Sequence, residues 1–104
     1  MAAQDIEPHD VPERHRYEAR VDGELAGYIE YRPAGRERVF RHTQVLDAFE
    51  GKGVGSALVR AALDDLRARG LTVRPLCPFV AEWLRRHPDQ LDLVTDGFHL
   101  ESRR

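Results

Sequence analysis

Alternating apolar and polar residues predict a series of antiparallel strands in the first half of the chain. The alternation covers residues 17–21 and resumes over residues 25–31, with Asp22-Gly23 between the two runs. An Asp-Gly pair in this position favours a two-residue hairpin turn, because both turn residues must adopt a positive φ. We therefore expect a β-hairpin centred on Asp22-Gly23.

A third alternating run covers residues 38–46, after a break at Pro33-Ala34-Gly35. Strict alternation assigns this run to two faces, with Val39, Arg41, Thr43 and Val45 on one and Phe40, His42, Gln44 and Leu46 on the other. Three consecutive strands with short turns predict an antiparallel meander.

The apolar period changes from that of a strand to that of a helix after Gly51. Helical spacing continues to Leu66 and predicts a helix of about 16 residues that ends before Gly70. Residues 71–76 favour a short strand, which should be parallel to a neighbour because a helix precedes it. A second helix is expected from Pro78 to His87, with a buried stripe formed by Phe79, Val80, Trp83 and Leu84.

Together these elements predict an α/β (α+β) domain with a mixed, mainly antiparallel sheet, an N-terminal β-meander, one long helix and a second short helix. The chain of 104 residues is long enough for one domain. We expect a loose N-terminal arm over residues 1–13, the folded domain over residues 14–95 and a C-terminal tail over residues 96–104.

Composition and charge narrow the class of function. The 16 basic and 18 acidic residues give a net charge of −2, which argues against a nucleic-acid partner. The chain has no apolar run of the roughly 20 residues that a membrane helix needs. Neither the single cysteine nor the histidine spacing fits a metal site, and no metal is expected. The lone cysteine and the lack of a secretory pattern favour a cytoplasmic location.

The central motif is the glycine-rich turn Gly51-Lys52-Gly53-Val54-Gly55-Ser56, between a predicted strand and the long helix. The first amides of a helix have no internal acceptor and lie at the positive end of its dipole, so this turn favours binding of a phosphate or pyrophosphate. The alternative is a flexible connection that allows close packing of helix and sheet. A P-loop is disfavoured because Gly53, not Ser or Thr, follows Lys52, and a dinucleotide fingerprint because Ser56 replaces its third glycine.

These residues carry a family resemblance. The run over residues 51–59 resembles the acyl-CoA pyrophosphate loop of the GNAT superfamily of N-acetyltransferases. That loop has the motif Gln/Arg-x-x-Gly-x-Gly/Ala, and Gly53 and Gly55 match its two glycine positions. Glu50 stands at the first position, where the motif has Gln or Arg. More specifically, residues 14–95 resemble a small single-domain acetyltransferase-like family. The segments that carry this likeness are His42-Thr43-Gln44-Val45, the glycine-rich turn, and Pro75-Leu76-Cys77-Pro78-Phe79 with a following His87-Pro88.

The resemblance implies acetyl-CoA or coenzyme A as the cofactor. It implies that backbone groups of Val45 and Leu46 bind the pantetheine arm. The residues implied to hold the pyrophosphate are those of the turn: Gly51, Lys52, Gly53, Val54, Gly55 and Ser56. The Lys52 side chain either adds a charge near the phosphate or is a solvated surface lysine.

Two residues are candidates for the chemistry. Cys77 lies where a strand ends and a helix begins, and a thiol at a helix N-terminus favours the thiolate, so Cys77 is a candidate acyl-accepting nucleophile. The alternative is that Cys77 is a small buried core residue. His42 is the best candidate for a general base, with an exposed strand histidine as its alternative.

The resemblance implies transfer of an acetyl group from acetyl-CoA to an amine on a small molecule or a peptide. Two other functions stay open: an acyl-CoA-binding module without catalysis, and an interaction domain whose sheet edge pairs with another copy. The oligomeric state is also open.

Overall fold

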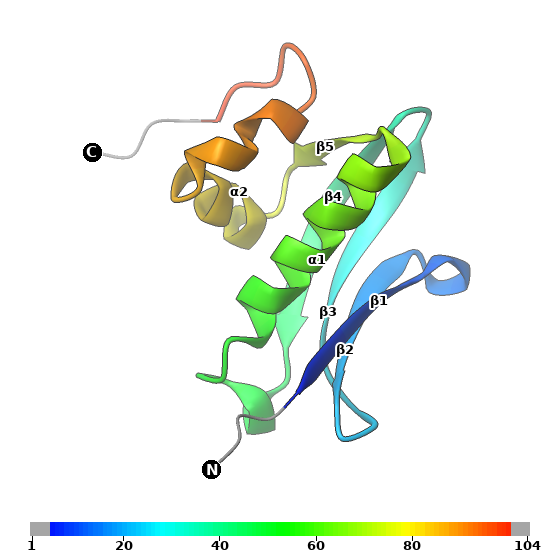
Figure 1. Cartoon of the computed structure of the whole chain (residues 1–104), viewed down its shortest axis with the longest axis vertical. Coiled ribbons are helices and arrows are strands. Elements are labelled where there is room, and N and C mark those ends of the chain that lie inside the picture. Colours follow the sequence, from blue (N-terminus) through cyan, green and yellow to red (C-terminus); the bar gives the residue numbers. More distant parts are fainter. Residues whose placement is uncertain (1–4, 101–104) are drawn as a thin grey trace.

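Five strands form a single sheet in the order β1-β2-β3-β4-β5 in the computed structural model, which describes residues 5–100 (Figure 1). The strands are β1 (Ile6–Val11), β2 (Arg16–Val21), β3 (Glu24–Ala34), β4 (Glu37–Val45) and β5 (Thr72–Pro75). The α-helices are α1 (Val54–Arg69) and α2 (Pro78–Arg85), and three short 3-10 helices are η1 (Pro12–Arg14), η2 (Asp47–Phe49) and η3 (Pro88–Leu93).

The strand pairing confirms the mixed, mainly antiparallel sheet. Consecutive strands from β1 to β4 are antiparallel, and β5 is parallel to β4 after the α1 crossover. The expected hairpin turn is present: Asp22 and Gly23 have φ values of 53° and 79°, as a turn with two left-handed residues requires. Gly70, with φ of 68°, ends α1 as predicted.

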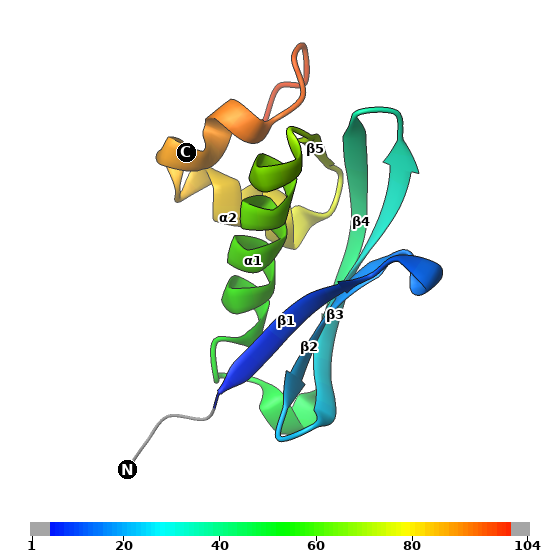
Figure 2. The same ribbon diagram turned by 45° about the vertical axis from the view of Figure 1, so that its right-hand side comes forward.

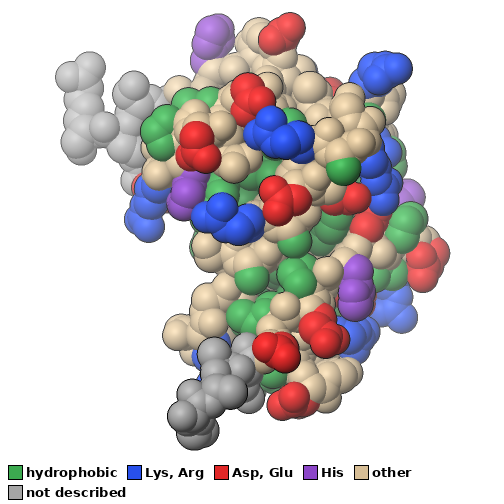
Figure 3. All heavy atoms as spheres, in the orientation of Figure 1, with side chains coloured by type: hydrophobic (Ala, Val, Ile, Leu, Met, Phe, Trp, Pro, Cys, Tyr) green, Lys and Arg blue, Asp and Glu red, His purple; other side chains and the backbone are tan. Residues whose placement is uncertain are grey.

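Both α-helices cover the same face of the sheet and leave the other face open (Figure 2). The core lies between the helices and the sheet, and its fully buried side chains include Ile29, Phe40, Leu58, Leu66, Val80 and Leu84. On the helix-bearing side, Lys and Arg side chains are interspersed with Asp and Glu (Figure 3). Within the described residues, no helix has the length and hydropathy to cross a membrane.

The expected loose arm over residues 1–13 is wrong for residues 6–11, which form β1 along the β2 edge. Asp10 holds this strand to the core, because it accepts a hydrogen bond of 2.7 Å from the Tyr31 hydroxyl and pairs with Arg69 of α1 at 3.4 Å. Burial and the bond to Asp10 raise the pKa of Tyr31, so its hydroxyl keeps the proton that it donates. Residues 1–4 of the arm lie outside the described residues.

A β-bulge at Arg41 changes which residues of β4 share a face. Tyr31 pairs with Phe40 and Ile29 pairs with Thr43, so Phe40 and Thr43 lie on the same face, toward the helices. His42, opposite Glu30, lies on the open face. The expectation of strict alternation, with Phe40 and His42 on one face, is therefore wrong.

Two further expectations are corrected in the C-terminal third. Phe79 does not belong to the buried stripe of α2, since it is 44% exposed, whereas Val80, Trp83 and Leu84 are buried. Residues 96–100 were expected in a free tail, but Leu100 packs against the core and the Arg74 guanidinium lies 5.5 Å from the centre of the Phe98 ring. Residues 101–104 lie outside the described residues.

Candidate functional site

The glycine-rich turn leads directly into the N-terminus of α1. Gly51 and Gly53 have φ values of 79° and 83°, a conformation that glycine adopts without strain. A Cβ atom added at either position would meet no other atom within 4 Å, so both glycines face open space. Ala57 donates to the Gly53 carbonyl in the first turn of α1. The backbone amides of residues 54–56 lie before the first hydrogen bond of the helix and have no acceptor within it. The N-cap residue Gly53 provides no side chain that could accept from them.

Two other glycines let the start of α1 come close to its neighbours. A Cβ atom at Gly27 of β3 would lie 2.7 Å from the Gln44 carbonyl oxygen and 3.1 Å from Val54 Cγ1. A Cβ atom at Gly55 would lie 2.6 Å from the Phe79 ring. The glycine at position 55 therefore serves packing against α2, whereas Gly51 and Gly53 serve the open turn.

The last turn of α2 is tied to the start of α1 by a polar contact. Trp83 Nε1 donates a hydrogen bond of 2.9 Å to Ser56 Oγ, and the His87 ring stacks on Trp83 at 3.6 Å. Phe79, Glu82 and Arg86 complete the lining of a depression of about 280 Å³ beside the turn. Ser56, the last residue of the turn, also lines this depression, so the two adjoin each other.

The sheet opens between β4 and β5 on the same side of the molecule. Pairing between these strands ends at Phe40 and Pro75, and the Phe40 carbonyl then accepts both the Leu76 and the Cys77 amide at 3.0 Å. Beyond this point β4 continues while the chain turns into α2 (Figures 1 and 2). The second half of β4 is therefore left without β5 as a neighbour, and we refer to this opening as the β4–β5 split.

Val45 and Leu46 differ in whether their backbone amides are available to a ligand in the split. The Leu46 amide donates to the Ala26 carbonyl at 2.9 Å, and the Leu46 carbonyl accepts from Phe49. Because backbone groups alternate between the two edges of a strand, the Val45 amide faces the edge that β5 leaves uncovered. Val45 therefore fits the expected contact with an extended ligand, and the Leu46 amide does not.

Cys77 is the N-cap residue of α2, where the sequence predicted a strand end and a helix start. It is buried, and its sulfur lies 3.1 Å from Thr43 Oγ1 on β4. Both side chains thus border the β4–β5 split from the helix side. The contact between Thr43 and Cys77 could not be predicted from the sequence. The Thr43 side chain points toward Cys77 only because of the bulge at Arg41, which the sequence pattern does not show.

The structure does not bring His42 together with Cys77. His42 is exposed on the open face, and its ring lies 6.3 Å from the Tyr28 ring. It follows the bulge at Arg41 and so borders the same split from the other side of the sheet. Lys52 is exposed in the turn. The two candidate catalytic residues therefore approach the split from opposite faces.

Comparison with known proteins identifies the family. The family model described as GCN5-related N-acetyl-transferase matches residues 16–93, which is most of the chain and includes the turn, the split and α2. The chain belongs to the GCN5-related N-acetyltransferase family. This membership confirms the resemblance to the GNAT superfamily and assigns the chain to a family of acetyl-transfer proteins.

The chain is also similar to curated proteins and to solved structures. The chain is 27% identical over 77 residues to Protein NATD1 of Xenopus tropicalis, covering 72% of this chain and 71% of the relative. The NMR structure of a GCN5-like protein from Staphylococcus aureus superposes on this chain with a TM-score of 0.64 and 22% sequence identity. The match covers 98% of this chain and 100% of that one, so the two proteins share the fold. The crystal structure of ribosomal-protein-alanine N-acetyltransferase from Brucella melitensis gives a TM-score of 0.52 and 26% identity over 86% of this chain and 70% of that one.

Proposed function

We propose that the chain transfers an acetyl group from acetyl-CoA to the nitrogen of an amine. The observation that carries the proposal is the open glycine turn, whose free amides at the start of α1 lie next to the β4–β5 split. Amides at a helix N-terminus bind phosphate well, because the donors converge and the helix dipole favours negative charge. Family membership supports the same reaction class.

The chain's residues suit the successive parts of acetyl-CoA. The amides around Gly53 would bind the diphosphate, since a Cβ at this position would fill the space that the ligand needs. The uncovered edge at Val45 would bind the pantetheine arm as an extra strand. The thioester would then lie in the split, near Cys77 and Thr43.

Two routes of transfer are compatible with this site. In direct transfer, the amine nitrogen bonds to the thioester carbon, the carbon–sulfur bond breaks, and the coenzyme thiolate takes up a proton that the nitrogen loses. In the two-step route, Cys77 sulfur attacks first, coenzyme A leaves as the thiol, and the amine then removes the acetyl group from Cys77. Thr43 Oγ1 is the polar atom at the Cys77 sulfur and would orient the thiol.

Calorimetry and mass spectrometry test the proposal on the full chain. We expect acetyl-CoA to bind, and incubation with a panel of amines to give acetylated products together with free coenzyme A. An acetyl group found on Cys77, with no transfer by Cys77→Ala, would establish the two-step route. An active Cys77→Ala chain would establish direct transfer. Binding without transfer would leave the acyl-CoA-binding module, and absence of binding would refute both functions.

A further inference from the structure

The open face of the sheet carries a depression of about 380 Å³ that the acetyl-CoA site does not use. Its lining residues come from η1 and the residue after it, from β3 and from the second half of β4. Glu30 and His42 place it on the face of the sheet that carries no helix. The residues that line it are Arg14, His15, Glu30, Tyr31, Arg41 and His42. We refer to it as the open-face depression.

Two irregular backbone positions direct side chains into this depression. Arg41 is the extra residue of the β4 bulge, and bulges turn side chains away from the regular alternation of a strand. His15 follows η1 with φ of 52° and ψ of 48°, a left-handed conformation that non-glycine residues adopt uncommonly. The depression is therefore shaped by the bulge at Arg41 and the left-handed conformation of His15, and not by a regular sheet surface.

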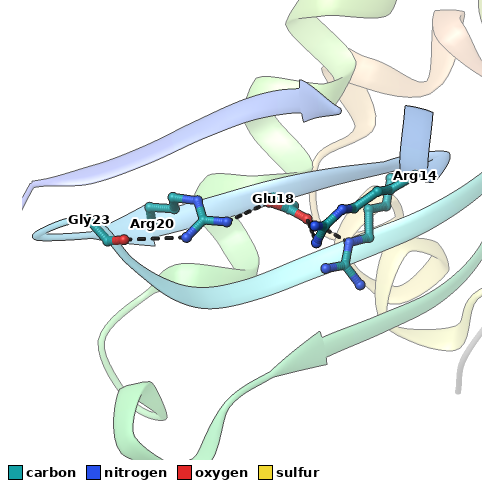
Figure 4. Close-up of polar contacts among 5 residues, drawn as sticks. Arg14, Glu18, Arg20 and Gly23 are labelled. Carbon is teal, nitrogen blue, oxygen red and sulfur yellow. Dashed lines mark hydrogen bonds and ion pairs between the residues drawn. The ribbon is translucent and has the colours of Figure 1, made fainter. Parts of the chain in front are cut away.

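Arg14, which lines the depression, belongs to a group of arginines around the Glu18 carboxylate (Figure 4). The Glu18 carboxylate is buried on this face and contacts Arg16 at 2.7 Å, Arg20 at 3.0 Å and Arg14 at 3.5 Å. Burial opposes the charge of Glu18, but the hydrogen bonds and charges of Arg16 and Arg20 outweigh it and lower its pKa. Three guanidinium groups therefore share one negative charge. Arg14 makes the longest contact and is 61% exposed, so it can bind a second anion.

The depression also has one carboxylate and one further cation. Glu30 and His42 are directly opposite each other in the β3–β4 register. Within residues 5–100, neither Glu30 nor Arg41 makes a side-chain hydrogen bond or ion pair, and both are exposed. Glu30 can hold an ammonium group, while Arg41 and Arg14 can hold a carboxylate, which a guanidinium binds with two parallel hydrogen bonds.

The position of the depression connects it to the β4–β5 split. Arg41 and His42 directly follow Phe40, whose carbonyl makes the last backbone contacts with the β5 side of the split. A nitrogen bound beside His42 on β4 would therefore approach the split from the open face, opposite to Cys77, while Glu30 lies on the β3 side of His42.

We propose that the open-face depression binds the acyl acceptor, and that this acceptor is a small amine that carries its own carboxylate, as an amino acid does. This inference rests on the proposed acetyl transfer. Arg41 and Arg14 hold the carboxylate and Glu30 holds the ammonium group. His42 removes one proton from the ammonium, the nitrogen–carbon bond forms, and the carbon–sulfur bond breaks. The coenzyme thiolate takes the second proton of the nitrogen, so that amide, thiol and one released proton are the products.

The test uses the full chain with acetyl-CoA and pairs of acceptors that differ only in the carboxylate. Each amino acid is compared with its carboxamide, and putrescine and spermidine serve as amines without an anion. We expect kcat/KM to be at least about 10-fold higher for the preferred amino acid than for its carboxamide, since the carboxamide loses the charge-assisted hydrogen bonds to the guanidinium groups.

Variants identify the residues responsible. Arg41→Gln should raise KM for the amino acid about 10-fold and leave KM for its carboxamide unchanged. Arg32→Gln is the matched control, because Arg32 is an exposed arginine of β3 that does not line the depression, and it should change neither value. His42→Gln should lower kcat by about 100-fold with KM unchanged. Acetyl-CoA affinity, measured by calorimetry, should be the same in all three variants.

The outcomes separate this inference from the proposed function. Equal or faster transfer to carboxamides or polyamines overturns the inference and leaves acetyl transfer intact. A preference for the amino acid that persists in Arg41→Gln also overturns it. Intact acetyl-CoA binding without transfer to any acceptor overturns the inference, whereas absence of acetyl-CoA binding refutes the proposed function itself.

Discussion

Gly53→Asp is expected to raise the Kd for coenzyme A by about 100-fold or more, while the chain stays folded. The aspartate carboxylate would stand at the amides that bind the diphosphate, and the loss of two charge-assisted hydrogen bonds of about 1.5–3 kcal/mol each accounts for this factor. Aspartate tolerates the left-handed conformation that Gly53 has with φ of 83°. Calorimetry with coenzyme A measures the affinity, and circular dichroism checks the fold.

Gly35→Asp is the matched control for this substitution. Gly35 lies in the β3–β4 turn with φ of 61°, a Cβ atom there would also meet open space, and the length of β4 separates it from the glycine turn. The control makes the same change in net charge and backbone preference, and it should leave coenzyme A affinity within about twofold of the parent chain. Equal losses of affinity in both variants would show that net charge or strain, and not the turn, controls binding.

Gly27→Ala is expected to lower the free energy of unfolding by about 3 kcal/mol, because the added methyl group meets backbone. The new Cβ atom would lie 2.7 Å from the Gln44 carbonyl oxygen, which is backbone of the neighbouring strand and cannot rotate away. It would also press on Val54 and Leu58, and so push the start of α1 away from the sheet. Urea denaturation measures the change.

Gly23→Ala separates crowding from the general cost of replacing a glycine. Gly23 has φ of 79° and open space around it, so alanine there meets no crowding. The free energy of unfolding should fall only by the cost of the left-handed backbone conformation, about 1–2 kcal/mol. Gly27→Ala should be the less stable of the two chains. The reverse order would contradict the close approach of β3, β4 and α1 that positions the glycine turn.

The elements that depend on local signals could be predicted from the sequence. The Asp22-Gly23 hairpin rests on turn chemistry, α1 on a long apolar period with Gly70 after it, and the position of Cys77 on the proline that follows it. Each of these signals lies within a few residues of the element that it specifies.

The features that depend on contacts between distant residues could not be predicted. The strand β1 was missed because its inward side includes the polar residue Asp10, whose partners Tyr31 and Arg69 lie far away in the sequence. The exposure of Phe79 was missed because its ring covers Gly55 instead of entering the core.

The bulge at Arg41 had the largest consequence for the candidate site. It places Thr43 against Cys77 and directs His42 to the open face, and nothing in the alternation of residues 38–46 marks it. One extra residue in β4 thus decides on which face of the sheet Thr43 and His42 stand.

The most direct test of the account is an amide NMR titration of the ¹⁵N-labelled full chain with coenzyme A, and with pantetheine as the analogue that lacks the diphosphate. We predict that coenzyme A shifts the amide resonances of residues 51–56 most strongly, and that pantetheine leaves them in place. Resonances of Gly35 and Gly97, which share the positive φ but lie outside the turn, should not move. Coenzyme A that leaves residues 51–56 unshifted, or that shifts them no more than pantetheine does, would contradict the account.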